Sequence, residues 1–170
     1  MKKTVFFYCI FAIILIQNTN GQQLGEKYTD TNGFFNISMP NGWEIYEFEN
    51  ELVIIGPQDA GVTPNMGFGI DDYTGSASGY NNLLINEFSN YFSNFNLINR
   101  SVFRTNAGIN GEYFTFSCTE GNLRLRMRMY AIPNKSGIIM AAVACAAPEA
   151  GGEKYDAVFD ACIKTFNWIK

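Results

Sequence analysis

The chain has 170 residues, a formal net charge of -4 and a composition that is 47% hydrophobic, 15% aromatic and 16% charged. This length predicts one domain with a real core, and the apolar fraction excludes a disordered chain. The pI of about 4.8 argues against a nucleic-acid-binding protein, which usually carries a basic excess. The chain has no histidine, which excludes His-based acid–base catalysis, Ser-His-Asp and Cys-His pairs and His-containing metal sites.

The N-terminus has the pattern of a secretory signal peptide. Two lysines precede an apolar run over residues 5–16, and the small residues Thr19 and Gly21 follow in a polar stretch. The run is shorter than the roughly 20 apolar residues that a transmembrane helix needs. We therefore expect residues 1–21 to be removed and the mature chain to begin at Gln22. An uncleaved membrane anchor is the alternative.

The expected mature protein is exported to the periplasm, the cell surface or the medium. It keeps 10 basic and 16 acidic residues, a net charge of -6. Cys9 lies inside the apolar run after large residues, whereas a lipid-modified cysteine follows small ones, so we expect no lipidation. We expect no membrane span after cleavage.

Residues 22–32 predict a polar lead-in, and residues 33–170 predict a single domain because no interior linker or repeat interrupts them. Alternating apolar residues predict strands over 34–39, 43–48, 52–55 and 65–71, with 43–48 and 52–55 forming a hairpin. A helix is predicted next, with Ser78 as its N-cap. Its apolar face repeats at spacings of three and four through Leu84, Phe88, Tyr91, Phe92 and Phe95. A strand over 97–104 follows.

The second half predicts a hairpin of residues 113–119 and 122–132 around Glu120-Gly121. Setting Thr119 opposite Asn122 pairs Cys118 with Leu123, Phe116 with Leu125 and Phe114 with Met127, so that the apolar residues share one face. Residues 138–147 are apolar on both sides and predict a central strand. A final helix is predicted over 155–168, with Phe159, Cys162, Ile163 and Phe166 on its apolar face. This order of elements predicts an α+β fold with a mainly antiparallel sheet flanked by helices.

Three local patterns resemble PsbP-like domains. Residues 35–43, Phe-x-Ile-Ser-Met-Pro-Asn-Gly-Trp, are similar to the opening strand and turn of that family. Gly108-x-x-Gly111 resembles its mid-domain turn, and the long penultimate strand with a closing helix that carries Phe166 is similar too. The resemblance spans roughly residues 33–168 and implies the Mog1/PsbP-like fold, an α/β/α sandwich.

The same resemblance implies little about function. Plant members of the family are extrinsic subunits of photosystem II, Mog1 binds a small GTPase, and many bacterial members are envelope proteins of unknown role. This chain has no histidine for a His-containing metal site and no thylakoid-type targeting segment. The resemblance therefore transfers the fold and not the photosystem role.

The candidate binding residues are Arg124, Arg126 and Arg128, which alternate along one strand and so share one face of the sheet, about 7 Å apart. Guanidinium groups suit carboxylates and phosphates, so this face predicts a docking patch for an unknown protein or an anionic envelope component. The alternative is a solvated or helix-covered face whose arginines pair with nearby acids.

Acidic residues offer two weaker candidates. Asp71-Asp72 precedes a Gly/Ser loop and could supply oxygen ligands to Ca²⁺, although it lacks EF-hand spacing. The first hairpin carries four glutamates that could act as paired carboxylates in a glycosidase, namely Glu44, Glu47, Glu49 and Glu51. The alternatives are a solvated strand end and a charged hairpin that resists edge-to-edge pairing.

The mature cysteines, Cys118, Cys145 and Cys162, lack metal spacing and have no histidine to activate them. Cys145 on the central strand and Cys162 on the closing helix predict the disulfide, if any bond forms. Cys118 is expected on the same sheet face as Cys145 but about 10 Å away, too far for a bond.

These observations predict a non-enzymatic exported protein that binds a macromolecule and uses no cofactor and no nucleic acid. Two alternatives stay open. One is a small-ligand carrier with an apolar pocket between the sheet and the helix over 84–95. The other is a carboxylate-based hydrolase that uses the acids named above.

Overall fold

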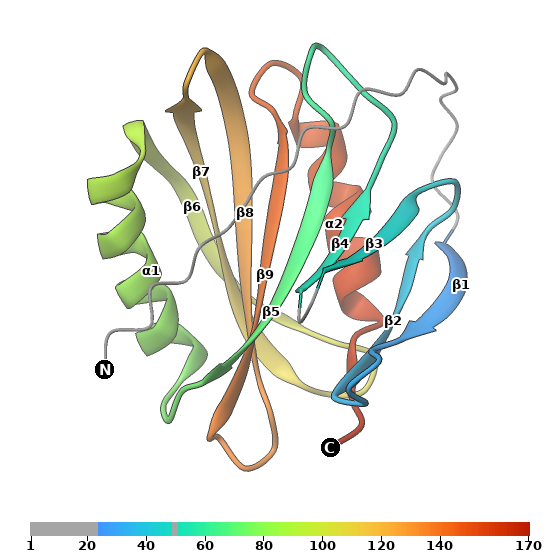
Figure 1. The fold of residues 1–170 in the computed structure, drawn as a ribbon. Helices are drawn as coiled ribbons and strands as arrows, with labels where there is room; N and C mark the ends of the chain where they lie inside the picture. The colour runs from blue at the N-terminus through green and yellow to red at the C-terminus, as the bar shows by residue number, and fades with distance from the viewer. Residues whose placement is uncertain (1–23, 49–50) are drawn as a thin grey trace.

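The computed structural model describes residues 24–48 and 51–170, so the predicted signal peptide and Glu49 lie outside the described residues. The described strands form a seven-stranded sheet in the order β3-β4-β5-β9-β8-β7-β6 and a three-stranded sheet in the order β1-β2-β10 (Figure 1). Every named pairing is antiparallel, which confirms the predicted α+β class. The elements are β1 Leu24–Thr29, β2 Phe35–Pro40, β3 Glu44–Phe48, β4 Glu51–Ile55, β5 Asn65–Asp72, α1 Ala77–Tyr91, β6 Ser93–Arg104, β7 Asn110–Glu120, β8 Leu123–Pro133, β9 Ile139–Pro148, α2 Glu153–Lys164 and β10 Asn167–Trp168.

The two helices lie on opposite sides of the seven-stranded sheet (Figure 1). Helix α1 packs on β6, β7 and β8, and we call this side the α1 face. Helix α2 and the three-stranded sheet cover the opposite side, the α2 face. Each face buries its own hydrophobic cluster, because side chains alternate between the two faces along every strand.

Strand β9 confirms the prediction of a central strand covered on both faces. It lies between β5 and β8, and all its residues after Ile139 are buried. Ala142 and Ala144 point into the cluster of the α1 face, whereas Val143 and Cys145 belong to the cluster of the α2 face. Apolar residues on both sides of a strand are what such a position requires.

The β7–β8 hairpin has the predicted faces but a different register. Glu120 pairs with Leu123 and Cys118 with Leu125, so the turn residues are Gly121 and Asn122 rather than Glu120 and Gly121. Phe116 accordingly lies opposite Met127 and Phe114 opposite Met129. Gly121 has a φ of +59°, a conformation that glycine adopts without strain. The shift is two residues, so each side chain keeps its predicted face.

Helix α1 begins and ends earlier than predicted. Its N-cap is Ser76, whose Oγ accepts a hydrogen bond from the Gly79 N–H at 3.0 Å, and not Ser78. The helix ends at Tyr91, which is 72% exposed, and Phe95 belongs to β6. Asn94, the second residue of β6, has a φ of +54° where the chain reverses after the helix. Aromatic rings at helical spacing therefore continued past the helix end, because helix and strand pack on the same cluster.

The first and last elements of the predicted domain also differ from the expectation. Residues 22–32, predicted as a polar lead-in, contain β1, a largely exposed strand that pairs with β2. Helix α2 ends at Lys164, because the Thr165 hydroxyl donates to the Cys162 carbonyl at 2.7 Å and the next residues leave the helix. Asn167–Trp168 then pairs with β2 as β10. Both β1 and β10 are strands because they pair with β2, and the local periodicity of the sequence does not reveal such a pairing.

Candidate functional site

The three arginines of β8 share the α2 face, as predicted, but two of them are not accessible. The side chains of Arg126 and Arg128 are 11% and 4% exposed because α2 lies over them, whereas Arg124 is 81% exposed. Arg126 donates two hydrogen bonds to Asp156, at 3.1 and 2.6 Å. The expected docking patch of three arginines is therefore wrong for Arg126 and Arg128, which hold a helix of their own chain.

Arg128 is the centre of this buried charge network. It donates to both carboxylate oxygens of Asp160 at 2.9 Å, and Asp160 also accepts the Tyr130 hydroxyl at 2.6 Å. Burial by itself lowers the pKa of Arg128. The charges of Tyr130, Asp160 and other neighbours together raise it by more, so the pKa lies above its ordinary value. Arg126 has a raised pKa because of its hydrogen bond to Asp156. Both arginines thus stay charged and paired.

The candidate carboxylates are occupied or dispersed. Asp71 accepts the Tyr80 hydroxyl, Glu44 accepts Tyr46 at 2.6 Å and Glu47 accepts Tyr28 at 2.5 Å. Across residues 24–48 and 51–170, no group of three or more metal-ligating side chains is positioned to hold a metal ion. The pairs of Asp71 and Glu47 join two elements and that of Glu44 lies within β3, and in each of them a single carboxylate faces a tyrosine rather than a second carboxylate.

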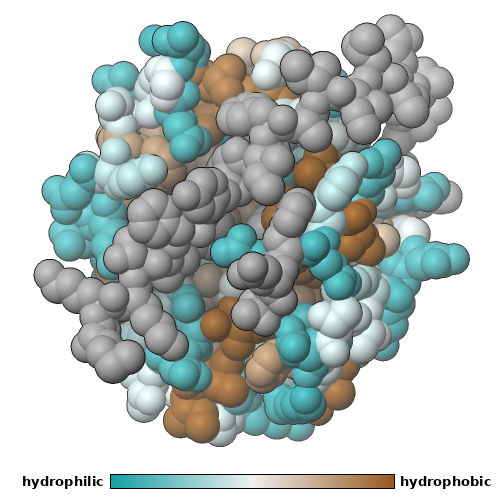
Figure 2. Space-filling model, viewed as in Figure 1, coloured by the Kyte–Doolittle hydropathy of each residue, from teal (hydrophilic) through white to brown (hydrophobic). Residues whose placement is uncertain are grey.

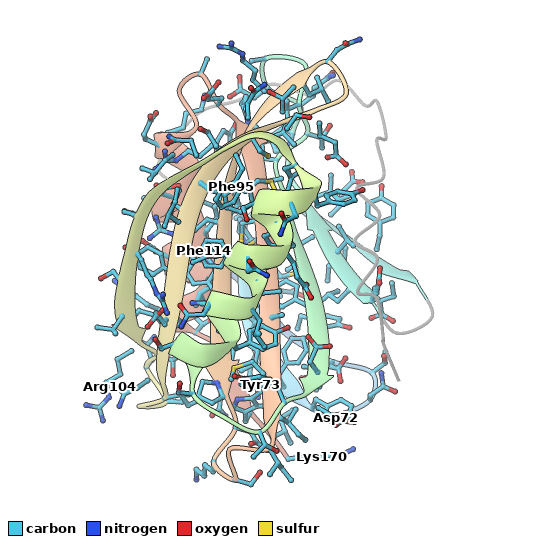
Figure 3. The ribbon with its side chains drawn as sticks, turned by 90° about the vertical axis from the view of Figure 1, so that its left-hand side faces the viewer. Asp72, Tyr73, Phe95, Arg104, Phe114 and Lys170 are labelled. Atoms are coloured by element: carbon cyan, nitrogen blue, oxygen red, sulfur yellow. The ribbon has the colours of Figure 1, made fainter. Side chains whose placement is uncertain are left out.

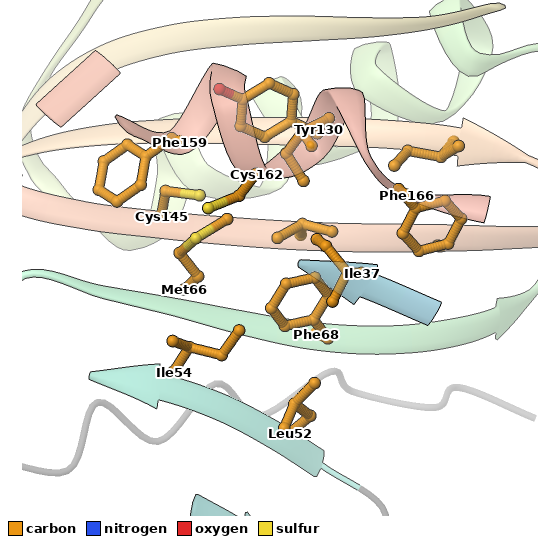
Figure 4. Close-up of a cluster of buried hydrophobic side chains, with 14 of the residues drawn as sticks. Ile37, Leu52, Ile54, Met66, Phe68, Tyr130, Cys145, Phe159, Cys162 and Phe166 are labelled. Carbon is orange, nitrogen blue, oxygen red and sulfur yellow. The ribbon is translucent and has the colours of Figure 1, made fainter. Parts of the chain in front are cut away.

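The cysteines divide between the two faces. Cys145 and Cys162 are buried thiols on the α2 face, and Figure 4 shows their sulfur atoms turned toward each other between β9 and α2. Cys118 belongs to the cluster of the α1 face, so the expectation that it shares a face with Cys145 is wrong. The two-residue shift in the β7–β8 register does not cause this; the position of Cys145 within β9 does, since Cys145 lies opposite Arg128.

The space between α1 and the sheet is packed with aromatic rings. Phe116 is fully buried. The centroids of the Phe88, Phe92 and Phe95 rings lie 5.6, 5.9 and 4.8 Å from the centroid of its ring. Figure 3 labels Phe95 of β6 and Phe114 of β7 on the strands beside the helix. The pocket that a small-ligand carrier would need under this helix is therefore filled.

An open groove does lie at the N-terminal end of α1. Its volume is about 720 Å³, and it separates the first turn of the helix from the adjacent ends of β6, β7 and β8. Its apolar wall includes Val102, Phe103 and Pro133, and its polar residues include Arg104 and Glu112. In Figure 3 this is the lower end of the molecule, where Arg104 extends away from β6. The remaining lining residues are Ser76, Ala77, Ser78, Asn110 and Gly111.

Arg100 fixes the polar side of the groove. Its guanidinium pairs with Glu112 of β7 and donates to Asn82 at 2.6 Å and to the Ser78 carbonyl and hydroxyl at 2.8 Å. One side chain of β6 therefore ties the N-terminal turns of α1 to β7. Arg100 balances the charge of Glu112, whose side chain is only 12% exposed. Apart from Ser76, the residues that line the groove belong to α1 and the three strands rather than to loops.

Exposed apolar residues continue from the groove along β6. Val102 is 75% exposed, and Leu97 and Ile98 are 43% and 44% exposed. Sequence reasoning did not single these residues out, because alternation alone does not show which strand ends a sheet. On the face seen in Figure 2, by contrast, hydrophobic residues form separate areas bordered by hydrophilic ones. In the part of the chain that the structure describes, no helix is long and apolar enough to span a membrane.

The fold resembles three solved structures over most of their length. Cyanobacterial PsbP (CyanoP) from Synechocystis matches with a TM-score of 0.62 and 15% identity, over 84% of this chain and 91% of that one. LpqN from Mycobacterium tuberculosis matches with a TM-score of 0.66 and 12% identity, over 89% of this chain and 93% of that one. The Ran-binding protein Mog1p of Saccharomyces cerevisiae matches with a TM-score of 0.62 and 6% identity, over 87% of this chain and 97% of that one. The chain has the Mog1/PsbP-like fold. Neither family models nor curated protein sequences match it.

The Mog1/PsbP-like fold confirms the resemblance drawn from residues 35–43, 108–111 and 166. The identities are too low to carry a site from one protein to another. LpqN is described as involved in cell envelope biogenesis and Mog1p as Ran-binding. The fold therefore occurs in proteins of different roles, and the site must be argued from the residues of this chain.

Proposed function

We propose that this protein is exported and acts without catalysis, by binding another macromolecule through the groove and the neighbouring part of β6. The open groove of about 720 Å³ beside the 75%-exposed Val102 carries the proposal. An open, partly apolar hollow on rigid elements suits a protruding side chain of a partner better than an enclosed small molecule. The predicted signal peptide supports export, and Ran binding by Mog1p supports a binding role for the fold.

The two alternatives fit the structure less well. A carrier would use the space under α1, and aromatic rings fill it. A hydrolase would need two facing carboxylates, and three of the candidate acids, Asp71, Glu44 and Glu47, are each bonded to a tyrosine. Of the three arginines, Arg124 is the one exposed enough to meet an anionic partner directly, so Arg124→Glu tests that contact without disturbing α2.

A photo-crosslinking residue at Val102, in cells that produce the protein, tests the proposed function. We expect a discrete adduct with another macromolecule, and no adduct when the crosslinker replaces Lys27, which is exposed on β1. The purified mature protein should begin at Gln22. Absence of an adduct at Val102, or equal adducts at both positions, would contradict a binding role for this surface.

A further inference from the structure

Strand β6 ends the seven-stranded sheet among the described residues, and half of it is regular. From Asn99 to Arg104 it pairs with β7 residue for residue, whereas both register shifts lie earlier, before Asn99. In an antiparallel edge strand, every second residue directs its backbone N–H and C=O away from the sheet. This regular stretch therefore presents a template for one more strand, directly beside the groove.

The opposite edge of the sheet lacks these properties. Strand β3 has five residues and carries exposed glutamates, Glu44 and Glu47, which discourage strand addition. The regular stretch of β6 carries two charges, and the guanidinium of Arg100 is turned onto Glu112 and α1. Arg104 is thus the accessible charge on this edge.

Side-chain alternation connects the edge to the groove. Val102 lies opposite Glu112, and both residues line the groove. In an added strand, the residue opposite Val102 would point to the same side of the sheet and enter the groove, since directly opposed side chains share a face. An apolar side chain there would cover Val102 and the apolar wall.

Arg104 supplies the charge that such a strand would meet. Its Nε donates to the Gly108 carbonyl at 3.3 Å, and it forms no ion pair with any other described residue. Figure 3 shows its side chain extending away from the end of β6. A carboxylate on the partner would form a charge-assisted hydrogen bond with this guanidinium.

A second copy of this chain fits the edge poorly. If two copies paired in antiparallel fashion with Val102 opposite Val102, Arg100 of one copy would lie opposite Arg104 of the other. Arg100 is already paired with Glu112, and β6 contains no acidic residue, so Arg104 of each copy would lie opposite an arginine and gain no carboxylate partner. An acidic segment from a different protein has the complementary charge.

We propose that an extended segment of a partner protein adds to β6 along residues 99–104, places an apolar side chain in the groove and sets a carboxylate on Arg104. This inference rests on the proposed binding function and specifies the chemistry of the partner. Main-chain hydrogen bonds would supply affinity, and the groove and Arg104 would supply selectivity.

A library of randomised linear peptides displayed on phage, selected against the folded protein, tests this inference. We expect enriched peptides to carry an acidic residue near an apolar one. The synthetic form of an enriched peptide should bind Arg104→Glu about tenfold more weakly than it binds the wild type. Val102→Lys should weaken binding by a similar factor. A peptide with lysine in place of its acid should recover binding to Arg104→Glu. The control for charge reversal elsewhere, Lys27→Glu at an exposed position of β1, should bind like the wild type.

Amide hydrogen exchange distinguishes strand addition from loose binding, because a loosely bound peptide would not slow the exchange of backbone amides. The bound peptide should slow exchange of alternate amides within residues 99–104. Equal binding to wild type and Arg104→Glu, protection elsewhere, no enrichment, or a wild-type dimer that Arg104→Glu dissociates would each overturn the proposal. Thermal unfolding of each variant establishes that it is folded. If these tests fail while crosslinks still form at Val102, the binding function stands and its partner is not a strand.

Discussion

The two faces of the seven-stranded sheet are stabilised in different ways, although the same strands build both. On the α1 face, phenylalanine rings pack around Phe116 under a single helix. On the α2 face, a larger cluster also buries the ion pairs of Arg126 and Arg128 with acids of α2. Alternation along β8 thus places methionines on one side and arginines on the other. Each face accepts charge only where a neighbouring element provides its partner.

Removing a ring from the α1 face should have the largest effect. Phe116→Ala deletes a fully buried side chain at the centre of the aromatic cluster, and we expect the free energy of unfolding to fall by about 3–5 kcal/mol. Urea unfolding measures this value. Leu83→Ala, at a 54% exposed position on α1, is the control and should change stability by less than about 0.5 kcal/mol. Similar values for the two variants would mean that the cluster is not tightly packed.

Breaking a buried ion pair on the α2 face should come next. Arg128→Ala leaves Asp160 without its cation, whereas Asp156 keeps its ion pair with Arg126. We expect a loss of about 3 kcal/mol, since Asp160 is partly exposed. Arg124→Ala removes the exposed arginine of the same strand and should cost less than about 0.5 kcal/mol. Equal losses from the two substitutions would contradict the difference in burial.

The sulfur pair would strengthen the α2 face further if it is oxidised. We predict a Cys145–Cys162 bond in protein isolated from an oxidising compartment, seen as an intact mass lower by two hydrogen atoms and as about 2–4 kcal/mol of added stability over the reduced form. Cys162→Ala should abolish the mass difference, whereas Cys118→Ala should keep it. Full recovery of reduced Cys145 and Cys162 from such protein would rule the bond out.

The same thiols should be unreactive once the protein is folded. Burial raises the pKa of Cys162 to about 12 and the pKa of Cys145 well above its ordinary value, so neither forms a thiolate at neutral pH. Alkylation of the reduced, folded protein at pH 8 should therefore be much slower than alkylation in urea. Equal rates in the two conditions would show that this face opens readily.

The smallest effect should come from the rim of the α2 face. The hydrogen bond from Lys154 lowers the pKa of Asp59, and Tyr155 donates to the same carboxylate at 3.0 Å. Because the folded-state pKa is depressed, the stability that this carboxylate adds is present above its unfolded pKa and is lost as pH falls through the folded pKa. Asp59→Asn should cost about 0.5 kcal/mol near pH 7, and this cost should disappear as pH falls through the folded pKa. Asp72→Asn, at an exposed position, is the control; equal pH profiles would contradict the linkage.

Sequence patterns predicted the elements best where burial and local periodicity agree. Residues 138–147 are apolar without a break, and the structure places β9 at the centre of the sheet. The arginine positions of β8 predicted their common face, because a register error of two residues leaves parity unchanged. The patterns failed at Phe95 and at Asn167–Trp168, where contact with another element decides whether helix or strand continues.

The candidate site was less predictable than the fold. Arg124, Arg126 and Arg128 have the same residue type and the same spacing, yet their side chains range from 81% to 4% exposed. Only the position of α2, whose Asp156 and Asp160 lie above the strand, separates them. Val102 and Arg104 had no local motif, since their exposure follows from β6 being the last strand of the sheet.

The sequence by itself determined the α+β class, the central strand and the face on which most strand side chains lie, because hydrophobic alternation is a local property of the chain. The tertiary structure decided which charges are buried, which strand ends the sheet and where a groove remains. These features depend on residues far apart in the sequence, such as Arg128 with Asp160 and Ser78 with Arg100. Burial and exposure arise only when such segments meet, and for that reason the binding surface lies where no motif marked it.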